Sequence, residues 1–146
     1  MLSLQEISDR LEIQELFVKY SHAVDTCDWD LYRSVFTTDA HIDYSAFGST
    51  VGGLEQTVAM LAENMPKLKS SQHSNTNSWI QIDGDLARAR TICFNPIVQD
   101  DNGADKITIC GLWYVDTLVR TSEGWRIKER VEEASYWMRA QSQQRV

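Results

Sequence analysis

The sequence lacks the features that would tie it to a disulfide framework or a membrane. Its three cysteines, Cys27, Cys93 and Cys110, form an odd set without paired spacing, which is typical of reduced thiols in a cytoplasm. No apolar run approaches the roughly 20 residues that cross a bilayer. The first residues also lack the basic start and apolar stretch of a signal peptide. We therefore expect a cytoplasmic protein with no membrane partner.

Basic residues are scarce as well. Lys and Arg number 14 against 21 Asp and Glu, giving a net charge of −7, and the bases are scattered among acids. Without a basic stripe to hold phosphates, nucleic acid is not an expected partner. The 42% apolar content of the 146 residues is typical of a globular protein. We predict one domain over residues 1–146, with a core at about 5–138 and a loose tail at Gln141–Val146.

The first half of the chain has helical patterning. Ser3 and Glu6 form a capping box, and apolar residues then recur at helical spacing. Asp28 can cap a shorter helix that buries its apolar residues as far as Phe36. The elements predicted for this half are a helix over 4–25, that shorter helix, a strand at Ala40–Phe47 and a helix at Leu54–Met65.

The second half is patterned as long strands separated by turns. The predicted strands are Trp79–Ile82, Leu86–Val98, Lys106–Arg120 and Trp125–Met138, with a polar loop at Gln99–Asp105. Helices followed by antiparallel strands predict the α+β class, in which helices cover one face of a curved antiparallel sheet. Such a sheet, wrapped by N-terminal helices into a cone, leaves a pocket of the kind that binds small molecules.

Two residues far apart in the sequence are the strongest candidates for chemistry. Asp25 ends the first predicted helix, and His73 opens a strand-like run. A carboxylate that accepts a hydrogen bond from one imidazole nitrogen leaves the other nitrogen free as a base. Asp25 could instead pair with a surface cation. However, an acid at a helix C-terminus faces the negative end of the helix dipole, which favours a special partner.

Metal binding and covalent catalysis are less well supported. His22, His41 and Asp43 could join the Asp25–His73 pair as metal ligands, but no Glu-x-x-His or paired-cysteine spacing accompanies them, so no metal is expected. Cys93 and Cys110 lie within apolar strands, where cysteine is usually a small buried hydrophobe. Cys27 lies too near Asp25 to gain a lowered pKa. A cysteine nucleophile is therefore not expected.

The whole chain resembles the nuclear transport factor 2-like superfamily, also called cystatin-like, and within it the SnoaL-like (polyketide cyclase-like) group. The resemblance rests on motifs spread from about residue 5 to residue 138. They are Ile13-Gln14-Glu15-Leu16, Val24 to Asp30, Phe36 to Ala40, Ile42-Asp43-Tyr44, Gly52-Gly53, Ser71-Gln72-His73 and Gly124 to Ile127. The fold implied is the curved sheet and cone described above. Function does not follow from the fold, which hosts enzymes and non-enzymes.

Two enzymes of the superfamily are similar in the segments that bear chemistry. Asp25, Tyr44 and His73 match scytalone dehydratase, and the Asp–His pair with Arg130 also resembles hexachlorocyclohexane dehydrochlorinase. These resemblances imply three catalytic residues, Asp25, His73 and Tyr44, with the Tyr44 hydroxyl holding a leaving group or a carbonyl oxygen. The residues expected to line the pocket are Tyr20, Trp29, Phe47, Asn95, Ile97, Leu112, Tyr114 and Arg130.

The departures from scytalone dehydratase concern the rest of that enzyme's site. Val24 replaces a tyrosine, and the second catalytic histidine falls near Asn95-Pro96-Ile97. A serine and an asparagine of the dehydratase correspond to Leu112 and Tyr114. The resemblance therefore implies a pocket with one general base and does not identify the substrate.

These observations predict a cofactor-independent lyase that eliminates water or another group from a small cyclic, aromatic or polyketide-like compound. Two alternatives stay open. One is a cyclase or isomerase that uses the same base, and the other is a non-catalytic subunit resembling the small chain of ring-hydroxylating dioxygenases. The related enzymes form trimers through their sheets, so the resemblance implies a homotrimer, with a dimer as the second choice.

Overall fold

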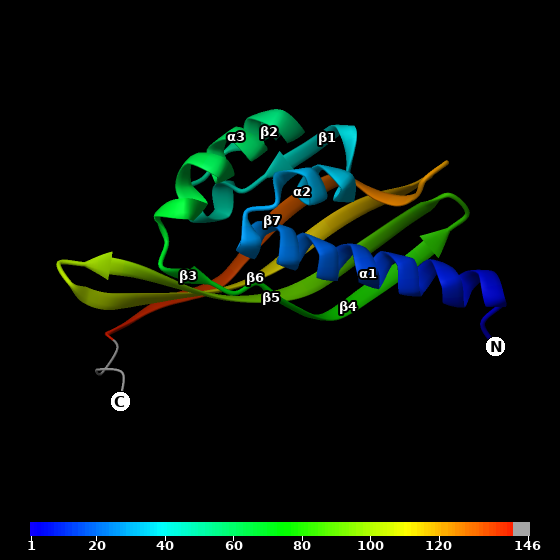
Figure 1. The fold of residues 1–146 in the computed structure, drawn as a ribbon. Coiled ribbons are helices and arrows are strands. Elements are labelled where there is room, and N and C mark those ends of the chain that lie inside the picture. Colours follow the sequence, from blue (N-terminus) through cyan, green and yellow to red (C-terminus); the bar gives the residue numbers. More distant parts are fainter. Residues whose placement is uncertain (142–146) are drawn as a thin grey trace.

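Three helices pack against one long, curved sheet in the computed structural model, which describes residues 1–141 (Figure 1). The α+β class and the cone-shaped arrangement predicted from the sequence are confirmed. The predicted tail at 141–146 lies outside the described residues, apart from Gln141, which ends the last strand. In the described part of the chain, no helix is both long and apolar enough to span a membrane.

The helices begin where the sequence places capping residues. Helix α1 (Leu4–Thr26) starts after Ser3, whose hydroxyl accepts the Glu6 N–H at 3.1 Å. Helix α2 (Trp29–Val35) starts after Asp28, whose carboxylate accepts the Leu31 N–H at 3.0 Å. Each cap satisfies an amide that has no partner within the helix. Helix α3 (Leu54–Asn64) lies next to β1 and β2 in the fold (Figure 1).

Seven strands form the sheet, in the order β2-β1-β7-β6-β5-β3, and β4 pairs with β5. Their bounds are β1 Phe36–Asp43, β2 Val51–Gly53, β3 Ser70–Ser71, β4 Ser74–Asp83, β5 Leu86–Asp101, β6 Ala104–Thr121 and β7 Gly124–Gln141. Short 3-10 turns lie at Ser45–Phe47 and Met65–Lys67. The prediction of a wholly antiparallel sheet is wrong at one place, because β1 runs parallel to β7. β1 is the first strand and β7 the last, so no hairpin joins them and an antiparallel pairing is not imposed.

Two predicted boundaries also change. The strand expected at Ala40–Phe47 starts earlier, at Phe36, and its last three residues form a 3-10 turn. The loop expected at Gln99–Asp105 is mostly strand, and Asn102 and Gly103 make the turn with φ of 56° and 89°. Asn-Gly suits a two-residue hairpin turn, so the polar residues around it stay paired in the ladder.

A buried carboxylate attaches α1 to the hairpin between β6 and β7. Asp9 accepts hydrogen bonds from Arg120 at 2.6 and 2.8 Å and from the Trp125 indole at 3.1 Å, and its side chain is only 4% exposed. These bonds, first those from Arg120, hold the pKa of Asp9 well below its ordinary value of 3.8. The stabilisation is therefore present above the pKa of the unfolded chain and is lost as the pH falls.

We expect Asp9→Ala to lower the free energy of unfolding by about 2 kcal/mol, because a hydrogen bond to a charged group typically contributes ~1.5–3 kcal/mol. Urea denaturation followed by circular dichroism measures the change. Asp85→Ala is the matched control: Asp85 binds the same Arg120 at 2.9 Å, but its side chain is 81% exposed, so its loss should have little effect. Equal losses in the two variants would contradict this account.

The outer face of the sheet, which points away from the helices, carries exposed apolar side chains. Trp113 and Val115 alternate with Leu112 and Tyr114, which point inward. On the neighbouring strands, exposed side chains on the outer face include Trp79, 68% exposed, Ile92, Phe94 and Val131. Monomeric soluble proteins rarely expose a contiguous apolar patch of this kind.

The homo-oligomer implied by the resemblance stays a prediction, and this face is where the copies would meet. We expect sedimentation equilibrium at micromolar concentration to give a species three times the mass of the 16.7 kDa chain. A species of twice the chain mass would still support an interface between copies, but as a dimer instead of the predicted trimer. A monomer over the same concentration range would show that the outer face is not an interface between copies.

Candidate active site

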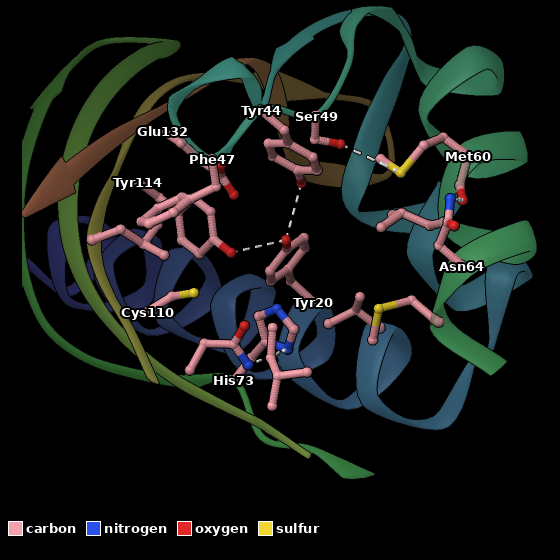
Figure 2. A pocket seen from close by; sticks show the side chains of 16 residues that line it. Tyr20, Tyr44, Phe47, Ser49, Met60, Asn64, His73, Cys110, Tyr114 and Glu132 are labelled. Atoms are coloured by element: carbon pink, nitrogen blue, oxygen red, sulfur yellow. Dashed lines mark hydrogen bonds between the residues drawn. The ribbon is translucent and has the colours of Figure 1, made fainter. Parts of the chain in front are cut away.

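A cavity of about 180 Å³ lies between the helices and the inner face of the sheet. Side chains from α1, α3, β5, β6 and β7 and from the segments after β1 and β3 enclose it (Figure 2). The polar groups on its wall are His73, Glu132, Asn95, Asn64, Ser49 and the phenols Tyr20, Tyr44 and Tyr114. The rest of the lining is mostly apolar, so charge in this cavity is poorly screened.

Asp25 and His73 meet as predicted. The last turn of α1 places the Asp25 carboxylate 2.6 Å from His73 Nδ1, and its second oxygen accepts the backbone N–H of His73 at 2.8 Å. A carboxylate only accepts, so Nδ1 carries the proton and Nε2 presents a lone pair. Within the described residues Nε2 makes no hydrogen bond, and the imidazole lines the cavity. Asp25 itself stands behind the imidazole rather than on the wall.

Asn95 fixes the segment that carries the imidazole. Its amide donates to the Gln72 carbonyl at 2.9 Å and to the Ser71 hydroxyl at 3.1 Å. It reaches His73 from β5, which pairs with β3 just before the histidine. The histidine segment is thereby held from two sides, by Asn95 and by Asp25. Asn95 lines the pocket as expected. Its hydrogen bonds hold the segment that carries His73 in position.

Four tyrosine hydroxyls form a chain across the cavity wall. Tyr32, Tyr44, Tyr20 and Tyr114 are joined in that order by contacts of 2.9, 3.0 and 3.1 Å. Figure 2 shows the last two of these contacts, and Tyr32 lies behind the wall. Burial raises the pKa of all four phenols above the ordinary value of 10, so they stay protonated. Four protons serve three contacts, which leaves one O–H to donate outside the chain. The predicted role of Tyr44 is therefore shared, because its own hydroxyl already contacts Tyr20 and Tyr32.

Arg130 lies behind this wall instead of on it, which corrects its expected place in the pocket. Its guanidinium is fully buried and binds Asp116 through two bonds of 2.8 and 2.7 Å. It also lies 4.2 Å from the ring centre of Tyr20 and 4.1 Å from that of Tyr114. Arg130 therefore packs against the rings of two residues that line the cavity, Tyr20 and Tyr114, and does not line it itself.

The sequence analysis missed Glu132, which lines the same cavity. It follows Arg130 by two positions on β7, and residues two apart share a face of a strand. Strand alternation from Arg130, which the resemblance had suggested for the pocket, would therefore also have pointed to Glu132. Burial raises the pKa of Glu132 to about 7, aided by the nearby Asp43 and opposed by Arg130. A carboxyl group with such a pKa can hold or release a proton at neutral pH.

The other predicted residues fall into two groups. Tyr20, Tyr44, Phe47, Ile97, Leu112 and Tyr114 line the cavity as expected. Trp29 does not: its ring packs against Tyr32 at 6.2 Å between centroids, because α2 turns it toward the core. Cys110 also lines the cavity, and burial raises the pKa of its thiol. A protonated thiol is a poor nucleophile.

Comparison with known proteins places this geometry in a family. Rv2910c of Mycobacterium tuberculosis, a protein of uncharacterized function, is 46% identical over 132 residues, which cover 90% of this chain and 89% of that protein. The crystal structure of Kfla4162 from Kribbella flavida is 28% identical, covers 90% of this chain and 93% of the other, and has a TM-score of 0.81. A hexachlorocyclohexane dehydrochlorinase, LinA type 2, shares the fold with a TM-score of 0.82 at 16% identity, over 94% and 92% of the two chains.

The match to a domain family covers most of the chain. The region runs from residue 5 to residue 131 and includes Asp25, His73 and Arg130, with Glu132 immediately after it. The superfamily resemblance expected from the sequence is thus confirmed at the level of the domain. This protein belongs to the SnoaL-like domain family.

Proposed function

We propose that this protein is a cofactor-independent lyase that eliminates a small group, such as water, from a cyclic or aromatic compound. The observation that carries the proposal is the Asp25–His73 contact of 2.6 Å, with Nε2 of the histidine turned to a largely apolar cavity. Nε2 would remove a proton from a carbon atom of the substrate. Asp25 would hold the imidazole in the required tautomer and stabilise the imidazolium that forms.

The phenol chain supplies the complementary interaction. Removal of a proton next to a carbonyl group places negative charge on the carbonyl oxygen. Where Tyr20 and Tyr32 both donate to Tyr44, the Tyr44 O–H is free to donate to that oxygen. The Arg130 cation lies directly behind the rings of Tyr20 and Tyr114. Donors that are fixed before the reaction need no rearrangement when the charge develops. This arrangement favours a substrate with a carbonyl group beside the acidic carbon.

The size of the cavity limits the substrate. Its volume of about 180 Å³ lies below the roughly 300–1,000 Å³ common for ligand pockets. A compound of one ring, or two small fused rings, suits this space better than an extended polyketide. A neighbour in fold, the dehydrochlorinase, is an eliminating enzyme by name. This agrees with elimination here, although the low identity makes it an argument from the fold alone.

Two other functions use parts of the same geometry. A cyclase or isomerase would begin with the same proton removal, so only the product distinguishes it from a lyase. A structural subunit would not need a histidine whose ring is bound by a carboxylate and whose chain segment is held by a neighbouring amide. The contacts of Asp25 with His73 and of Asn95 with the preceding residues therefore favour an enzyme. Co-purification with a large catalytic chain would support the subunit.

We expect His73→Ala and Asp25→Asn each to lower turnover at least ~10²-fold, the usual range for loss of general base catalysis being about 10²–10⁴. An amide at position 25 has one accepting oxygen for two N–H groups. If that oxygen keeps the backbone N–H, its NH₂ faces Nδ1 and moves the imidazole proton to Nε2, which blocks the base. The turnover of the double variant should be little lower than that of the less active single variant, since the two residues act as one unit.

Turnover is measured on a panel of cyclic β-hydroxy ketones and small phenolic ketones. Exchange of the acidic carbon proton in D₂O, followed by NMR, reports proton removal even where no group leaves. His22→Ala and Asp30→Asn are matched controls, because both side chains lie on the surface near the same helix end. Unchanged exchange and turnover in His73→Ala on an accepted substrate would rule out the proposed base.

A further inference from the structure

Two ionisable side chains, His73 and Glu132, line the cavity, and the proposed base accounts for only the first. His73 and Glu132 come from opposite sides of the pocket, the first after β3 and the second from β7, with the phenol chain between them (Figure 2). The half-buried Glu132 makes no hydrogen bond to any residue of the described part of the chain. A carboxyl group in this position has no structural partner that would explain it.

The charged neighbours of Glu132 do not neutralise it. Arg130 precedes it by two residues on β7, but its guanidinium is already engaged by both oxygens of Asp116. Asp43, on the adjacent β1, is a second negative charge. The remaining titratable groups that sense Glu132 come from α2, the segment after β1, β5 and β6: they are Tyr32, Tyr44, Cys93, Cys110 and Tyr114. None of these supplies a positive charge.

We propose that Glu132 is a second catalytic residue, a neutral carboxylic acid that donates a proton to the leaving oxygen of the substrate while His73 removes the proton from carbon. This inference rests on the proposed lyase function and extends it by naming the leaving group. An acid on the wall opposite the base serves a hydroxyl group, which must leave as water. A halide leaves as a stable anion and needs no proton.

The step balances without any further reactant. Nε2 of His73 takes the proton from carbon, and the electrons of that C–H bond form the new double bond. The C–O bond breaks, and its electron pair, with the proton of Glu132, completes the departing water. The enzyme is left with an imidazolium and a carboxylate. Loss of a proton from His73 to solvent and gain of one by Glu132 restore the starting state.

Burial supports this protonation state, since the pKa of Glu132 is raised to about 7 from the ordinary 4.5. The unfolded chain therefore loses the Glu132 proton near pH 4.5, whereas the folded protein keeps it until about pH 7. Between these values the stability falls as the pH rises. Glu132→Gln removes the titrating group, so the melting temperature of the variant should rise relative to that of the wild type between about pH 4.5 and pH 7.

The leaving group provides the main test of the role. We expect Glu132→Gln to lower elimination from a cyclic β-hydroxy ketone at least ~10²-fold, the usual effect of losing a general acid. Elimination from the matching β-acetoxy or β-chloro ketone should fall less than ~3-fold, because those groups leave without a proton. For the hydroxyl substrate, wild-type kcat/KM should decline as the pH rises through about 7, the value for Glu132. That decline should be absent in the variant.

Glu133→Gln is the matched control, because Glu133 is the next residue of β7 but points outward to Arg90 at 2.8 Å. It should leave both substrates unaffected. Circular dichroism confirms that each variant folds. Equal losses on both leaving groups would make Glu132 structural, and unchanged rates on both would remove it from the mechanism while leaving His73 as the base.

A measurement without substrate separates this inference from the lyase proposal. A carbon-13 NMR titration of labelled glutamate carboxyls, with Glu132→Gln to assign the signal, reports whether Glu132 is protonated at pH 6. We expect a protonated carboxyl. An ionised Glu132 at that pH would overturn the acid role even if His73 proves to be the base. Failure of the wild type to act on any leaving group would count against the lyase proposal itself.

Discussion

The buried ion pair between Arg130 and Asp116 is the interaction on which the cavity wall depends. It sits between β6 and β7 with both side chains fully excluded from solvent. Such a pair contributes little net stability, because the desolvation of two charges offsets their attraction. Its value here is geometric. The guanidinium plane holds the rings of Tyr20 and Tyr114 on one side, and the bidentate contact fixes that plane in the sheet.

The same pair also affects the electrostatics of the pocket. Arg130 lowers the pKa of Glu132 and of the phenols Tyr20, Tyr32 and Tyr44, but burial outweighs this effect. The phenols therefore stay protonated, and the pKa of Glu132 is raised to about 7. The imidazole, the phenols and the Glu132 carboxyl thus share a small cavity beside a buried cation whose charge Asp116 balances.

The sequence predicts the fold and half of the site well, for identifiable reasons. The capping residues and the apolar spacing of α1 locate Asp25 at a helix end, and the motif around His73 links the two residues. The parallel pairing of β1 with β7 is not predictable in this way, because the two strands lie at opposite ends of the chain and no short connection fixes their direction. The sequence pattern also does not show how deeply a side chain is buried. Residue parity shows that Arg130 points inward, but only packing shows that two phenol rings cover it.

Glu132 illustrates the opposite error. Its parity equals that of Arg130, so its inward direction could be inferred from β7 alone. A charged residue in a strand is usually solvated, and neither enzyme resemblance directed attention to it. Trp29 shows a third kind of miss: a residue in the same motif as Asp25 can serve the core alone, as its packing on Tyr32 demonstrates.

Asp25 makes two hydrogen bonds with separate consequences. One oxygen orients the imidazole, while the other binds the backbone N–H of residue 73 and so joins the end of α1 to the strand region whatever side chain follows. Replacing the imidazole of His73 therefore removes only the first bond. The same aspartate continues to fasten the end of the helix to the sheet.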